Sequence, residues 1–204
     1  MIHELRTYTL KVGTMDKVIK LFAERLEHRT KYSPLGGFWY TEIGPLNQIV
    51  HLWPYKDLDE RNQVRAAFAK DPNWPPPIHE HIASMESDLI VPFPFMSEIK
   101  PGKLGPCYEL RSYILLPGTI PRLRELWEAK WAGRIKLTPN LLVGTTEFGE
   151  LHKLIHIWPY QSLEHRAQVR KQAVQMGVWP PDTGGLLMNM QNKIMFPAPF
   201  SPLQ

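Results

Sequence analysis

The stretch Glu4-Leu5-Arg6-Thr7-Tyr8 returns in the second half of the chain as Glu109-Leu110-Arg111-Ser112-Tyr113. The same shift, without a gap, places His51-Leu52-Trp53-Pro54-Tyr55 on His156-Ile157-Trp158-Pro159-Tyr160 and Trp74-Pro75-Pro76 on Trp179-Pro180-Pro181. Roughly a third of the aligned positions are identical, which indicates an internal repeat. We therefore divide the 204 residues into a first unit at 1–95, a linker at 96–105 and a second unit at 106–204.

The first half of each unit predicts a strand, a helix and two further strands. Residues 2–10 alternate between apolar and polar side chains, as a half-buried strand does. We expect Thr14 to cap a helix, because the apolar residues that follow it fall on one helical face. Residues 37–43 and 48–53 then predict two strands joined by a tight turn.

The second half of each unit predicts another helix and a last strand. Asp57 and Glu60 have the spacing of a capping box, and the helix that they open should continue to about residue 70. Ser162 stands at the matching position of the second unit. A final strand is expected near residues 86–91.

The order strand–helix–strand–strand–helix–strand defines the fold class, α+β with two tandem ferredoxin-like units. Each unit should form a four-stranded antiparallel sheet with both helices on one face. The other face would be bare and apolar, so it must pack against something. We expect the two bare faces to close on each other, giving a dimeric-type α/β barrel within one chain.

Strand alternation suggests which side chains line that barrel. Val50 and Leu52 are aliphatic in both units, so we assign them to the helix-covered face, and their neighbours His51 and Trp53 then point inward. The predicted lining, and with it the candidate ligand-binding site, comprises Glu4, Arg6, Tyr8, His51, Trp53, Glu109, Arg111, Tyr113, His156 and Trp158.

This set of residues permits two interpretations. In a pocket, a histidine beside a carboxylate could act as a general base, arginine or tyrosine could hold an oxyanion, and the aromatic rings would suit an apolar ligand. As plain structure, Glu4 and Arg6 would form an ion pair and the tryptophans would be core. Arg61 and Arg65, spaced four apart on a helix, require either acidic neighbours or an anion. No residue is assigned a catalytic role.

Composition removes several classes of function. The formal net charge is only +4 and no basic run occurs, so we expect no nucleic-acid partner. Neither a signal peptide nor a membrane span is visible, which favours a cytoplasmic protein. Cys107 is the single cysteine, and His79-Glu80-His81 lacks the spacing of two ligands on one helical face, so we predict no metal site. No cofactor-binding motif is present, and we predict none.

The motifs together resemble a known family. The run from Tyr108 to Tyr113, followed by Gly118-Thr119, resembles the start of a NIPSNAP domain, and His156 to Tyr160 with Leu163 to Arg170 resembles its second half. The resemblance covers nearly the whole chain in two copies, with His3 replacing the leading tyrosine in the first. It implies a dimeric α/β-barrel fold, shared with cofactor-free monooxygenases, haem-handling proteins and muconolactone-isomerase-like enzymes. It implies no reaction and no catalytic residues.

Three hypotheses for function follow. The first is a NIPSNAP-family protein that binds a small apolar or aromatic molecule in the barrel interior. The second is a non-enzymatic scaffold, which would expose apolar patches around Trp74 to Pro77 and Trp179 to Pro181 for self-association. The third is a monooxygenase-like or haem-binding barrel that uses His51 or His156. The partners considered are therefore a small-molecule ligand and further copies of the chain in a homo-oligomer.

Overall fold

The computed structural model describes residues 1–204 and contains the predicted element order twice. The first unit comprises β1 (Ile2–Leu10), α1 (Met15–Thr30), β2 (Gly37–Ile43), β3 (Gln48–Tyr55), α2 (Leu58–Phe68) and β4 (Ile82–Pro92). The second comprises β5 (Cys107–Leu115), α3 (Ile120–Arg134), β6 (Leu142–Phe148), β7 (Lys153–Tyr160), α4 (Leu163–Gln175) and β8 (Leu187–Pro197). A single 3-10 turn, His79–His81, precedes β4.

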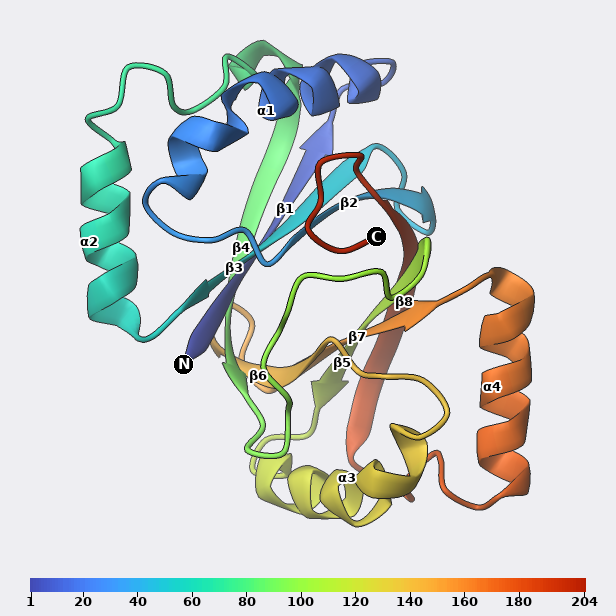
Figure 1. The fold of residues 1–204 in the computed structure, drawn as a ribbon. Coiled ribbons are helices and arrows are strands. Elements are labelled where there is room, and N and C mark those ends of the chain that lie inside the picture. The colour runs from blue at the N-terminus through green and yellow to red at the C-terminus, as the bar shows by residue number, and fades with distance from the viewer.

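The eight strands form one closed barrel in the order β1-β3-β2-β8-β5-β7-β6-β4. Within each unit the four strands pair antiparallel in the ferredoxin-like order. The units then join edge to edge, because β2 pairs with β8 and β4 pairs with β6. The helices lie outside this barrel, α1 and α2 beside the first unit and α3 and α4 beside the second (Figure 1). The predicted fold is confirmed.

Local capping explains where the second helix of each unit begins. The backbone N–H of Glu60 donates to Oδ1 of Asp57 at 2.9 Å, and that of His165 donates to Oγ of Ser162 at 3.1 Å. The prediction for Thr14 was wrong in detail. Its hydroxyl donates to the carbonyl of Lys11 at 2.7 Å and makes no capping bond, because its backbone (φ −108°, ψ 0°) does not have the extended geometry of such a cap. None of the helices is long and apolar enough to cross a membrane.

One part of the barrel interior is aliphatic, which reverses the predicted orientation of the strands. The rest is polar around a space of about 250 Å³, where Lys153 donates to Asp88 and Lys193 donates to Gln48. Leu5, Val50 and Leu52 belong to a single buried cluster with residues of the second unit that include Leu110 and Ile157. The predicted interior positions of Glu4, Arg6, Tyr8, His51, Trp53, Glu109, Arg111, Tyr113, His156 and Trp158 were therefore wrong, because these residues occupy the opposite, helix-facing side of the same strands. The physical reason is that both faces of the sheet are covered, so an aliphatic side chain fits either one.

One end of the interior is filled unequally by the two units. Trp39 and Tyr108 lie with their rings 5.4 Å apart and are completely buried. The repeat places Gly144 where the first unit has Trp39, and His3 where the second has Tyr108. Each large ring thus has a smaller residue at the equivalent place across the barrel, and the volume is shared without a clash.

The linker and the C-terminal tail cover the barrel core. Leu203 belongs to the interior cluster, and Ile99 and Leu104 of the linker pack against it. The tail and the linker hold each other through a bridge between Gly102 and Leu203. The linker is therefore a packed segment, and the division at 95 and 106 stays a prediction.

The close packing around Gly144 gives a first testable expectation. A Cβ at this position would lie 2.3 Å from the backbone carbonyl oxygen of Val91 in the neighbouring strand, which cannot move without breaking the β4–β6 pairing that joins the units. We expect Gly144→Ala to lower the free energy of unfolding by about 1–3 kcal/mol. Gly102→Ala is the control, since nothing lies within 4 Å of its Cβ. Equal urea midpoints for the two variants would contradict this packing.

The buried His3 gives a second expectation, on pH. It is fully buried with no partner for either ring nitrogen, and burial, aided by the charge of the N-terminal amine, lowers its pKa to about 4. In the unfolded chain His3 is protonated below about pH 6.5, whereas in the native state it stays neutral until about pH 4. The free energy of unfolding therefore decreases as the pH falls from 6.5 to 4. We expect His3→Leu to reduce the loss between pH 7 and pH 4 by roughly 3 kcal/mol. Urea denaturation at both pH values measures it, and an unchanged loss would refute it.

Candidate functional site

A cavity of about 460 Å³ lies between the first unit's sheet and its helix layer. The predicted residues of that unit, Glu4, Arg6, Tyr8, His51 and Trp53, all line it. The structure therefore brings them together as expected, but beneath α1 and α2 and not inside the barrel. Sequence reasoning missed the lining from the helices and the following loop, chiefly Phe22, Arg29, Phe68 and Trp74. The identity of Arg29 with Arg134 in the repeat was the available signal for one of them.

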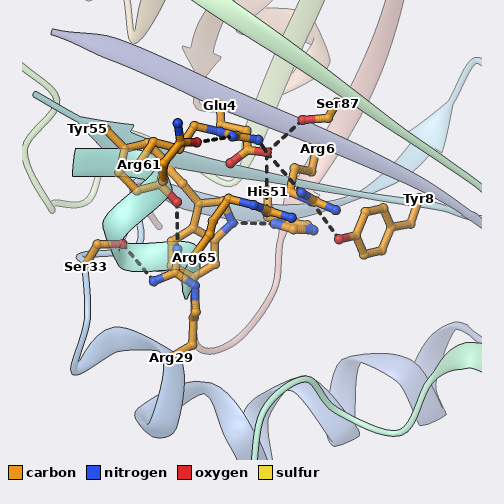
Figure 2. Close-up of polar contacts among 12 residues, drawn as sticks. Glu4, Arg6, Tyr8, Arg29, Ser33, His51, Tyr55, Arg61, Arg65 and Ser87 are labelled. Atoms are coloured by element: carbon orange, nitrogen blue, oxygen red, sulfur yellow. Dashed lines mark hydrogen bonds and ion pairs between the residues drawn. The ribbon is translucent and has the colours of Figure 1, made fainter. Parts of the chain in front are cut away.

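Glu4 is the centre of an ionic network, shown in Figure 2. Its Oε1 accepts hydrogen bonds from Arg6 Nη1 at 3.0 Å, Arg61 Nη2 at 2.8 Å and Ser87 Oγ at 2.9 Å. Arg65 Nη1 lies 3.8 Å from the same oxygen. Burial would raise the pKa of Glu4, but the hydrogen bond from Arg61 and the charge of Arg6 outweigh it and lower the pKa to about 2. The Glu4 carboxylate is therefore ionised at neutral pH and forms ion pairs with the arginines.

His51 is held neutral, with its proton on one defined nitrogen. Nε1 of Trp53 donates to Nδ1 of His51 at 2.6 Å, and an indole nitrogen can only donate, so Nδ1 carries the lone pair and Nε2 carries the proton. Nε2 is buried without a protein partner. The ring stacks on Phe38 with centroids 5.4 Å apart. Burial, and then the charge of Arg6, lower the pKa of His51 to about 3.

This arrangement makes His51 a neutral hydrogen-bond donor at the cavity wall. A general base acting through Nε2 would need the lone pair that the Trp53 contact places on Nδ1. Haem ligation through Nε2 needs the same tautomer, with a proton on Nδ1. The contact with Trp53 therefore argues against both the general-base and the haem hypotheses for this residue.

Arg29 is a buried cation that meets no carboxylate. Its side chain donates to Ser33 Oγ at 2.7 Å and to the Tyr55 hydroxyl at 2.8 Å, and the residue is only 3% exposed. The guanidinium lies 4.0 Å from the ring centroid of Trp53 and 4.6 Å from that of Phe68. These contacts with two aromatic faces stabilise the charge partly, but they leave it uncompensated.

The second unit repeats these polar contacts almost atom for atom. Arg111 and Arg166 donate to Glu109 Oε1 at 2.7 and 2.6 Å, with Asn192 in the place of Ser87. Trp158 donates to His156 at 2.6 Å. Tyr113 likewise sits with its ring edge against His156, and Arg134 covers Trp158 at 4.0 Å.

The cavity, by contrast, is nearly absent from the second unit, where about 60 Å³ remains. Trp127, which stands where the first unit has Phe22, packs against His156 with ring centroids 4.8 Å apart. Trp179 closes over Trp127 at 4.6 Å. The two units thus share a polar framework, and between sheet and helices only the first has room for a ligand.

The tautomer of His51 can be measured directly. We expect long-range ¹⁵N–¹H NMR spectra to show Nδ1 unprotonated and Nε2 protonated from pH 8 to pH 5, because the pKa lies near 3. His156 serves as the internal comparison, since burial and the charge of Arg111 also hold its pKa well below 6.5. Titration of His51 near pH 6.5, or a proton on Nδ1, would contradict the geometry.

Comparison with known proteins agrees with the fold and the repeat. The family model described as NIPSNAP matches residues 3–97 and again residues 108–202. The chain is 29% identical to the human protein NipSnap homolog 3A and 32% identical to the zebrafish (Danio rerio) protein NipSnap homolog 1; each alignment covers 100% of this chain, with 86% and 77% of those proteins.

Among solved structures, an anthrone oxidase-like protein superposes with a TM-score of 0.63 at 11% identity, covering 96% of this chain and 90% of that one. A protein from Lactobacillus acidophilus gives a TM-score of 0.67 at 9% identity, over 95% and 92%. At such identities the likeness concerns the fold alone. The two matches of the family model and the full-length relatives show that the chain belongs to the NIPSNAP family.

Proposed function

We propose that the first unit binds a small molecule with an apolar or aromatic body in the cavity between its sheet and helices α1 and α2. The observation that carries this proposal is the difference between the helix-side spaces of the two units. The first measures about 460 Å³ and is lined by Glu4, Arg6, Tyr8, His51 and Trp53, whereas the second measures about 60 Å³ and only Tyr113 of the equivalent residues lines it. The second unit has the same fold and polar residues although its helix-side space is almost filled. The fold therefore does not require the larger cavity of the first unit.

The size and the walls of the cavity support this proposal. Small-molecule sites occupy about 300–1,000 Å³ and combine apolar walls with a few polar groups. Tyr8, Phe22, Trp53, Phe68 and Trp74 provide aromatic surface here. Protein interiors are otherwise close-packed, and an unfilled space of this size forgoes contacts that a larger side chain would provide.

The scaffold hypothesis has less support. It expected exposed apolar patches at Trp74 to Pro77 and Trp179 to Pro181. Both tryptophans are half-buried: Trp74 lines the cavity and Trp179 packs on Trp127. These segments therefore serve as covers over the helix-side spaces. Assembly into a homo-oligomer stays a prediction.

The second unit suggests a substitution that should block the cavity of the first. We expect Phe22→Trp to place an indole against His51, as Trp127 lies against His156, and to weaken binding of naphthalene-2-methanol, a neutral aromatic probe, at least tenfold. The fold should be kept, since the second unit tolerates tryptophan at this position. Isothermal titration calorimetry measures the affinity, and thermal denaturation checks the fold.

The matched control is Trp127→Phe, which changes the second unit toward the first. It should leave binding in the first cavity unchanged. Equal affinity of the wild type and Phe22→Trp, with both folded, would place the probe elsewhere and refute the proposed site.

A further inference from the structure

The cavity in the first unit carries more positive than negative charge. Among the side chains that line it, Arg6, Arg29 and Arg65 are cations and Glu4 is the one carboxylate. Arg61, just outside the lining, also donates to Glu4. His51 adds no charge, because its pKa is about 3. The arginines of the lining thus outnumber its carboxylate by two, before Arg61 is counted, and the apolar walls reduce the screening by water.

Two donors at the cavity are without protein acceptors. Arg65 makes no side-chain hydrogen bond, and the nearest carboxylate oxygen lies 3.8 Å away, beyond hydrogen-bond distance. Nε2–H of the buried His51 has no protein partner. The Arg65 side chain is 39% exposed, so its N–H groups are open to a ligand, whereas Nε2 of His51 exposes almost no surface. An anionic oxygen is the acceptor that a guanidinium binds most strongly.

The second unit shows that the charge surplus alone does not make a site. Arg111, Arg134 and Arg170 likewise place positive charge near His156, beside the single carboxylate Glu109, and that unit folds with almost no cavity. A ligand site needs the surplus, the free donors and the space at one place. The first unit alone combines the three.

We infer that the molecule bound in the first unit is an organic carboxylate: an aromatic or apolar body against Phe22, Trp53 and Trp74, with its anionic group contacted by Arg65. This inference rests on the proposed function and adds the chemical class of the ligand. A guanidinium offers two parallel N–H groups to a carboxylate, which orients the head group as well as attracting it.

The test uses three probes with the same aromatic body, titrated calorimetrically into the full chain at low salt. They are 2-naphthoate, naphthalene-2-methanol and 2-naphthylmethylammonium, which are anionic, neutral and cationic. We expect 2-naphthoate to bind about tenfold more tightly than the alcohol, and the ammonium compound to bind most weakly. The advantage of the anion should shrink at high salt, where charges are screened.

The matched variants are Arg65→Gln and Arg170→Gln, which change equivalent arginines of the two units. Arg65→Gln should weaken 2-naphthoate about tenfold and change the alcohol less than twofold, while Arg170→Gln changes neither. Arg65→Lys should recover part of the affinity for the anion, because it restores the charge without the planar pair of donors.

The results distinguish a failure of the proposed binding site from a failure of the carboxylate inference. If no probe binds, or if Phe22→Trp leaves binding of all three unchanged, the cavity is not a ligand site and both proposals fall. If the acid and the alcohol bind equally, or if Arg65→Gln weakens both alike in a folded protein, the carboxylate inference is wrong and the proposed cavity stands.

Discussion

The pairing of β2 with β8 and of β4 with β6 is the constraint on which the rest of the structure depends. It turns two four-stranded sheets into one barrel without a free edge, so the backbone groups at the edges of each unit are satisfied by the other unit. Closure also fixes the destination of every strand side chain. Leu5, Val50 and Leu52 point into the interior, so the side chains on alternate positions of the same strands lie under the helices. The candidate site is therefore a consequence of closure, not an addition to it.

The sequence predicts the architecture well because an ungapped repeat shows every element twice. The strand at 2–10, the cap at Asp57 and the four-stranded order were all visible in the pattern. The grouping of Glu4, Arg6, Tyr8, His51 and Trp53 on one face was also predictable, since alternation needs only their parity. The side to which this face turns was not predictable. Both faces of the sheet are covered, and alternation shows which residues share a face but not whether that face meets the helices or the barrel interior.

The cavity itself lay beyond sequence reasoning for a different reason. Its walls come from α1, α2 and the segment of Trp74, elements that the repeat preserves in both units. Whether space remains depends on single substitutions such as Phe22 against Trp127 and on how far Trp179 turns inward. The same holds inside the barrel, where Trp39 and Tyr108 face the smaller Gly144 and His3. In both places a large side chain in one unit corresponds to a smaller one in the other. The space that results can be determined only from the packed structure.

The chemistry available in the cavity follows from which groups are already occupied. Glu4 cannot serve as a base at neutral pH without giving up its hydrogen bonds to Arg6, Arg61 and Ser87, and a carboxylate with a pKa of about 2 is a weak base in any case. The lone pair of His51 is taken by Trp53. What the cavity still offers is donors, positive charge and aromatic surface. These groups recognise and orient an anion with an apolar body, and binding is the function that the occupied and unoccupied groups support together.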